Sequence, residues 1–208
     1  MDVQSNVATK IMLSAKELDV VSNIDWLLTK HKIIAKVLQH FAVVSQQMLS
    51  SVAANANSLP AIVALHPPKI AKGENYVQLP YVMLDYPRFF LKNEALAIRT
   101  FFWWGNHISM HLLLNGSFKI QYQTKVIALI PFLQQHQFYI CVQQTEWQHH
   151  FSNDNYMPMQ NADIDLLASI IINKQFIKLA KKIPLQQWEN FNDFFDTTFK
   201  QMLNILST

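Results

Sequence analysis

Glycine, cysteine, arginine and charge are all scarce in this chain. Of its 208 residues, three are glycine, one is cysteine and two are arginine, and 15% are charged, against about 25% in a typical soluble domain. Three glycines cannot build the phosphate loops of the P-loop and dinucleotide-binding designs, so nucleotide enzymes of those designs are excluded. The lone Cys141 excludes an intrachain disulfide, which favours a reducing compartment and a cytoplasmic location.

Long apolar runs and a strong excess of one charge are also missing. No apolar run approaches the roughly 18 residues of a membrane span, and residues 1–4 (MDVQ) lack the apolar segment of a signal peptide. The formal net charge of +3 is too close to neutral for a protein that binds nucleic acid by neutralising phosphates. We therefore expect neither a membrane nor nucleic acid as a partner.

Side-chain amides and hydrophobic residues are abundant instead. The 18 glutamines and 15 asparagines, 33 amides in all, outnumber the 31 charged residues (17 basic plus 14 acidic), and 50% of the chain is hydrophobic. This composition is too apolar for a disordered chain, and it predicts a single folded domain over residues 1–208. Residues 100–118 and 126–145 carry no charge at all, so we expect these two runs at the centre of the fold.

Helical periodicity marks both ends of the chain. Residues 14–17 (SAKE) form a capping-box sequence, and apolar residues then recur at spacings of three and four, which predicts that residues 14–55 are helical. At the other end, residues 162–206 are predicted to form two helices, the first over 163–182 and the second from Pro184, a proline suited to a first helical turn. The apolar stripes of the terminal helices would also suit a homodimer.

Prolines punctuate the region between the N-terminal helix and the centre. Five of the eight prolines lie between Pro60 and Pro87. Because proline fixes φ and lacks a backbone donor, we predict that residues 56–95 form an ordered, mostly extended connection with one edge strand at 81–85.

Residues 96–148 are predicted to be rich in β-structure. Three strands would form a meander with two-residue turns at Gly105–Asn106 and Asn115–Gly116, the third strand being 117–123, and a fourth strand would lie at 138–143 after a helical segment. The expected fold class is α+β, with a central antiparallel sheet of three to five strands packed against N-terminal and C-terminal helices.

The predicted turns determine which residues share a face of this sheet. Trp104 would face His107, Tyr122 would face Ser109, and strand alternation would place His107, Ser109 and His111 together on the more apolar face. These five residues form our candidate ligand pocket. The simpler alternative is that the histidines are core residues, each bonded to a carbonyl or a tyrosine hydroxyl.

A metal site is a second hypothesis for the same face. His107 and His111 would supply two ligands, and Glu146, His149 or His150 in the following polar loop would supply others. The spacing is a weak signal, because it lacks the glutamate of the zinc-protease helix and lies on a predicted strand.

The two arginines, Arg88 and Arg99, are further candidate ligand-binding residues. Either guanidinium could hold an anionic group through two parallel hydrogen bonds. Alternatively, Arg88 would pair with Asp85 or Glu74 to fix the proline-rich connection, and Arg99 would lie along the sheet.

The run GENYVQLPYVMLDYPRFF, followed by AIRTFFWWGNHIS, resembles an uncharacterised family of conserved hypothetical bacterial proteins. The resemblance covers most of the chain and implies no activity, cofactor or catalytic residue. Because no complete catalytic set is present, we expect a non-enzymatic module that binds a small ligand or a protein partner. The alternative is a metal-dependent enzyme that uses His107 and His111 with Glu146, His149 or His150.

Overall fold

The computed structural model describes residues 11–207, and its chain divides into two compact units at Val37/Leu38. The prediction made for residues 1–4 lies outside the described residues. In the first unit, α1 (Ala15–Ser22) begins with the predicted capping box: the Ser14 hydroxyl accepts from the Glu17 backbone N–H, and the Glu17 carboxylate accepts from the Ser14 N–H at 2.7 Å. Helix α2 (Ile24–Ala54) begins in this unit, and its part from Leu38 onward belongs to the second unit.

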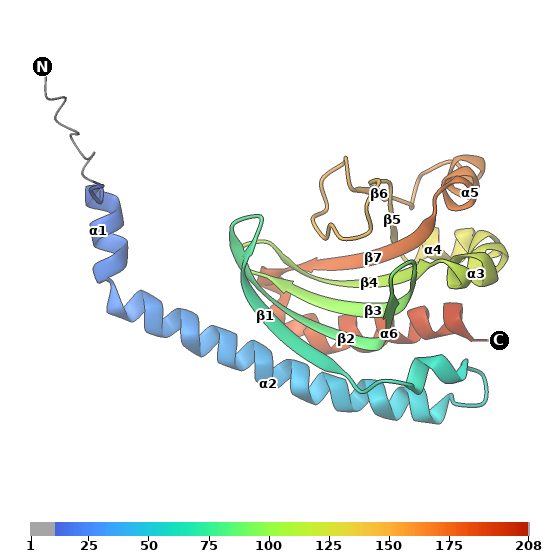
Figure 1. Ribbon diagram of the computed structural model, residues 1–208, viewed down its shortest axis with the longest axis horizontal. Coiled ribbons are helices and arrows are strands. Elements are labelled where there is room, and N and C mark those ends of the chain that lie inside the picture. The colour runs from blue at the N-terminus through green and yellow to red at the C-terminus, as the bar shows by residue number, and fades with distance from the viewer. Residues whose placement is uncertain (1–10, 208) are drawn as a thin grey trace, which may run out of the picture. The chain divides into compact units, whose positions relative to one another are not determined.

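The second unit is built on a seven-stranded antiparallel sheet, which confirms the α+β class and corrects the expected three to five strands. The strand order is β1-β2-β3-β4-β7-β5-β6 (Figure 1). The strands are β1 (Lys69–Tyr76), β2 (Leu79–Leu91), β3 (Glu94–Trp103), β4 (His107–Asn115), β5 (Tyr139–Cys141), β6 (Tyr156–Pro158) and β7 (Phe176–Pro184). The helices of this unit are the short 3-10 helices η1 (Ala61–Ala64) and η2 (Leu185–Asn190), with α3 (Ser117–Ala128), α4 (Ile130–Gln135), α5 (Ile164–Asn173) and α6 (Phe191–Leu206).

The two faces of the sheet are covered in different ways. Helix α6 packs against β4 and β7 on one face (Figure 1), and its buried aromatic ladder of Phe191, Phe195 and Phe199 stacks with ring centroids about 6 Å apart. Phe41 of α2 extends this stack at 6.0 Å from Phe191. The segment between β5 and β6, residues 142–155, covers the opposite face, and its contacts with that face form the polar network described below. No helix among residues 11–207 is long and apolar enough to cross a membrane.

Four predictions of local structure are wrong. Residues 117–123 belong to helix α3, because Phe118, Tyr122 and Val126 repeat every four residues, whereas Ile120, which alternation would have buried, is 76% exposed. The helix predicted over 163–182 ends at Asn173, and its second half is strand β7.

The third wrong prediction concerns the proline-rich connection, residues 56–95. It holds β1 and β2, and β2 alone has 13 residues. Pro80 is the second residue of β2, and Pro87 lies where the pairing register shifts between Asp85 and Arg88. Strand starts and irregularities of this kind are the positions that tolerate proline, since a ladder hydrogen bond is not required there.

The β3–β4 turn also differs from the expected one. It contains three residues, Trp104 to Asn106, with Gly105 at a φ of +71°. His107 therefore pairs with Trp103, and His111 pairs with Arg99. This one-residue difference changes the cross-strand neighbours of the histidines, while His107, Ser109 and His111 still share a face.

Candidate functional site

Three polar residues lie in one row across neighbouring strands of the sheet. Asp85 of β2 pairs with Arg99 of β3, which pairs with His111 of β4. Arg99 donates two parallel hydrogen bonds to the Asp85 carboxylate, from Nε at 2.7 Å and from Nη2 at 2.8 Å. The side chains of Arg99 and Asp85 are only 17% and 6% exposed, so this is a largely desolvated, charge-balanced pair.

His111 lies beside this pair and has both ring nitrogens occupied. Its Nε2 is 2.8 Å from the Ser109 hydroxyl, and its Nδ1 is 2.8 Å from the hydroxyl of Tyr156 at the start of β6. Burial lowers the pKa of His111 well below its usual value, and the charge of Arg99 lowers it further. His111 is therefore a neutral imidazole held in a fixed orientation.

The segment between β5 and β6, residues 142–155, adds a second imidazole. The His149 ring lies 4.9 Å from the His111 ring, and its Nε2 is 3.0 Å from Nη1 of Arg99. Tyr76 of β1 holds this part of the chain in place, because its hydroxyl oxygen accepts from the backbone N–H groups of His149 and His150 at 2.6 and 3.0 Å. The backbone here is thus fixed to the sheet by side-chain hydrogen bonds.

Lys178 of β7 completes the network. It is 2% exposed, and its Nζ donates to the backbone carbonyls of Glu146 and Gln148 at 2.6 and 2.5 Å and lies 3.1 Å from Nδ1 of His149. No carboxylate is bonded to it among residues 11–207. Burial accordingly lowers its pKa to about 7.

A cavity of about 20 Å³ adjoins this network, room for about one water molecule. Four of its lining residues belong to the network or bond to it: Arg99, His111, His149 and Lys178. The remaining lining residues are mostly apolar: Phe90, Ala97, Leu113 and Trp147, with Glu146 beside them. Trp147 is 51% exposed, so the cavity lies close to the surface.

The metal hypothesis gains no support from this geometry. His111 and His149 are brought together as the sequence suggested, but their nitrogens face hydroxyl, guanidinium and amine groups. The Glu146 carboxylate accepts from Asn115 instead. Within the described residues 11–207, no three His, Cys, Asp or Glu side chains are placed to hold a metal ion.

Ser109, His111 and Tyr156 have the spacing of a nucleophile, a base and a group that orients the base. Ser109 is fully buried, and it does not line the adjoining cavity. A substrate would have no position next to its hydroxyl, so the trio is a structural hydrogen-bond chain.

Three candidates from the sequence lie away from this network. Trp104 is in the β3–β4 turn, Tyr122 bonds to the Leu206 carbonyl at 3.0 Å, and Arg88 bonds to the Pro67 carbonyl at 2.7 Å. His150 contacts the network through its backbone N–H, which donates to Tyr76. Arg99, not Arg88, is the partner of Asp85, and Lys178 and Tyr156 were not predicted.

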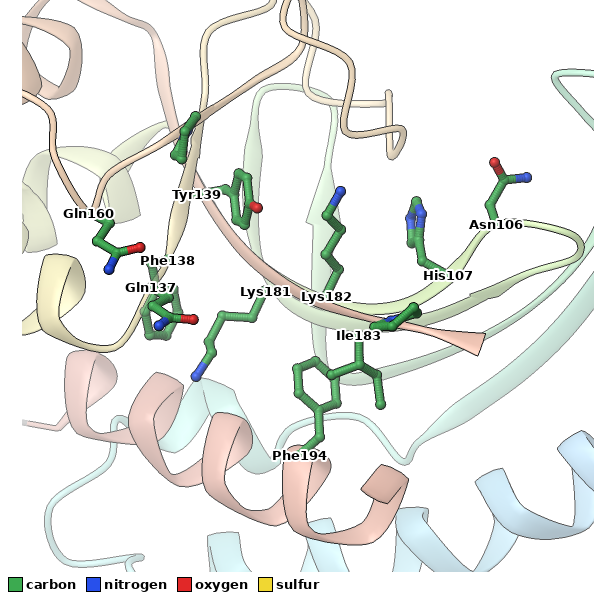
Figure 2. Close-up of a pocket in the computed structure, with 12 residues that line it drawn as sticks. Asn106, His107, Gln137, Phe138, Tyr139, Gln160, Lys181, Lys182, Ile183 and Phe194 are labelled. Carbon is green, nitrogen blue, oxygen red and sulfur yellow. The ribbon is translucent and has the colours of Figure 1, made fainter. Parts of the chain in front are cut away.

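A second, more open site lies where β5 stops pairing with β7. The pairing ends at Tyr139 and Ala180, and beyond it a pocket of about 600 Å³ is lined by residues 181–184 of β7 together with residues 137–139 (Figure 2). The remaining lining residues are Asn106, His107, Pro158, Gln160 and Phe194. Figure 2 shows Lys182 and His107 extending from one face of the sheet, while Lys181 extends toward α6.

The charge of this pocket is entirely positive. Its lining residues, all of them within the described chain, include Lys181 and Lys182 but no Asp or Glu. Lys182 lies 4.7 Å above the Phe151 ring, and Lys181 lies 5.3 Å above the Phe138 ring and 3.2 Å from the Gln201 side-chain oxygen. Burial lowers the pKa of both lysines.

His107 connects the pocket to the buried face. It is 7% exposed, and burial, with a smaller contribution from Lys182, lowers its pKa to about 4. Its Nε2 is buried and has no hydrogen-bond partner among the described residues, and a buried polar atom without a partner costs about 1 to 3 kcal/mol.

Comparison of the chain with family models, with curated proteins and with solved structures finds no match. The resemblance inferred from the sequence therefore stays a prediction, and the function must be argued from the two sites.

Proposed function

We propose that this protein is a non-enzymatic binding module for a small organic acid, held in the pocket beside residues 181–184 of β7. The observation that carries the proposal is the pair Lys181 and Lys182, which lie on opposite faces of one strand and line the same pocket without an acidic partner in its lining. A carboxylate or phosphate at the strand edge would be attracted by both ammonium groups.

Electrostatics favours an anion over a neutral ligand. The pKa of each lysine is lowered because each ammonium is partly desolvated and has no opposing charge in the pocket lining. An anion would supply that charge and would raise both pKa values, which is equivalent to binding energy. The side-chain amides of Asn106, Gln137 and Gln160 add hydrogen-bonding groups around the same space.

Malate, a dicarboxylate, tests the proposal. We expect it to raise the melting temperature of the protein and to bind measurably by calorimetry, because it carries the negative charge that the pocket lining lacks. Glycerol, which has hydroxyls and no charge, should not bind measurably.

Two variants give the test its controls. Lys182→Met should weaken malate binding by about tenfold, as expected for the loss of one charged hydrogen bond, while Lys72→Met, at an exposed position on β1, should leave it unchanged. Malate affinity that is equal in the wild type and in Lys182→Met, or that is undetectable in the wild type, would contradict the proposal.

A further inference from the structure

Exposed apolar side chains are concentrated in the first unit. Residues 11–37 are a short part of the described chain, 11–207, yet they hold 11 of its 21 exposed large hydrophobic side chains. No residue of α1 is buried. Concentrated apolar surface of this kind marks a site of association. The 11 side chains are those of Ile11, Met12, Leu13, Leu18, Val20, Val21, Ile24, Trp26, Leu27, Leu28 and Ile33.

The first turns of α2 carry a regular seam within this surface. Ile24, Leu28, His31 and Ala35 follow one another at spacings of four, three and four, the repeat with which two helices pack side by side. All four side chains are exposed, that of Ile24 by 69% and that of Leu28 by 50%. Leu27 widens the seam and is 47% exposed.

Two opposite charges flank the seam along one edge. Asp25 follows Ile24 and Lys32 follows His31, so the two charged residues lie seven positions apart on the same side of α2. Both side chains are exposed. Seven residues span about 10 Å along a helix, which is too far for the two charges to pair within one copy.

We propose that this seam binds a second copy of the chain in the antiparallel direction. Ile24 of each copy would then lie opposite Ala35 of the other copy, and Leu28 would lie opposite His31. The same alignment brings Asp25 of each copy toward Lys32 of the other, whereas a parallel pair would place like charges at the same level. The contact is symmetric, so both copies use the same surface.

Charge favours a second copy over a lipid surface. Helices that lie on anionic membranes have a polar face rich in lysine and arginine. Residues 15–37 carry four lysines and three acidic residues, a net charge of only +1, and Asp25 lies at the edge of the seam itself. The acidic residues are Glu17, Asp19 and Asp25, and the lysines are at positions 16, 30, 32 and 36.

The size of the surface suits a weak but specific dimer. Specific interfaces use about 20 to 30 residues from each partner, and residues 11–37 provide a segment of that length. The homodimer expected from the sequence is thereby assigned to the N-terminal end of the chain, since the apolar residues of α6, such as Phe195, Phe199 and Leu206, are already buried. None of the residues that line the β7 pocket is used.

Sedimentation velocity of the wild-type protein between about 5 and about 200 µM tests the proposal, a range chosen for a weak interface. We expect the average mass to rise toward that of a dimer. Leu28→Gln should weaken dimerisation by at least about tenfold, because each dimer loses two buried leucines. Val43→Gln, at a 54% exposed position farther along α2, is the matched control and should leave dimerisation unchanged.

Charge reversal shows whether the partner is a second copy. Asp25→Lys and Lys32→Glu should each weaken dimerisation by about threefold to tenfold, since each replaces two attractive pairs by repulsive ones. An equimolar mixture of the two variants should recover the dimer, because every facing pair in the mixed dimer again has opposite charges. A lipid surface or an unrelated protein would give no such recovery.

Cysteine cross-linking shows the direction of packing. Under mild oxidation, Ile24→Cys mixed with Ala35→Cys should form a disulfide-linked dimer, while Ala35→Cys alone should not; the native Cys141 is buried. The proposal is overturned if the wild type is monomeric at about 200 µM or if Leu28→Gln and Val43→Gln dimerise equally. It is also overturned if the mixture of charge variants does not recover, or if Ala35→Cys alone cross-links.

Discussion

Lys178 and Lys182 lie on the same face of β7 with only Ala180 between them in the alternation, yet their surroundings differ. Lys178 is covered by the segment over the sheet, whose carbonyls bind its Nζ, while Lys182 lies at the rim of an open pocket above an aromatic ring. The residue type and the strand are the same in the two cases. The segment between β5 and β6, residues 142–155, therefore determines the state of a lysine on this face of β7. Lys178, which it covers, is a neutral amine, whereas Lys182, which it leaves open, is a cation that can bind an anion.

The largest expected effect on stability comes from removing the negative charge of Asp85, the partner of Arg99. Asp85→Asn should lower the free energy of unfolding by about 3 to 5 kcal/mol, because Arg99 would remain buried without a counter-charge. The matched control is Asp196→Asn, which breaks the exposed pair with Lys200 and should cost about 0 to 1 kcal/mol. Urea denaturation followed by circular dichroism measures both; equal losses would show that the covered pair has no special role.

A smaller loss of stability is expected from replacing Lys178, and Lys182 serves as its matched control. Lys178→Met keeps a similar volume but leaves two carbonyls and the His149 N–H without partners, which should cost about 2 to 4 kcal/mol. Lys182→Met should change stability by less than about 0.5 kcal/mol, as is usual at an exposed position. If the two variants had the same urea midpoint, the covering segment would not distinguish these lysines.

The smallest effect is a slope in the pH dependence of stability. The pKa of Lys178 is about 7 in the folded protein and 10.5 for an ordinary lysine. Between these values the unfolded chain holds a proton that the folded protein lacks, so stability should rise with pH, by at most about 1.4 kcal/mol per pH unit. Urea midpoints between about pH 7 and about pH 9 measure the slope, which should be shallower in Lys178→Met and unchanged in Lys182→Met.

The shared face of His107, Ser109 and His111 could be predicted from the sequence because it depends only on strand alternation. It survived a wrong turn length, since shifting the partner strand changes the neighbours of these residues but not their own face. The partners of His111 could not be predicted. Tyr156 lies 45 residues farther along the chain, in a strand of three residues.

Two elements were misread because their sequences carry a second periodicity. Residues 117–123 alternate like a strand and also place Phe118 and Tyr122 four apart, and the buried position of Tyr122 beside α6 favours the helix. In β7 the lysine at 178 looks like the polar side of a helix, whereas it is an inward-facing residue of a strand that is buried on both faces. A charged residue in such a position contradicts the usual pattern, and this strand borders both candidate sites.

The ends of the sheet have a consequence for how this protein behaves at high concentration. An uncovered strand edge invites another chain to pair with it, and lysine or proline at the edge discourages that association. Strand β1 carries Lys69 and Lys72, the three-residue β6 ends in Pro158, and the part of β7 beyond its pairing with β5 carries Lys182 and Pro184. These side chains protect the sheet from growing into fibres, and they leave the β7 pocket better suited to a small molecule than to an added peptide strand.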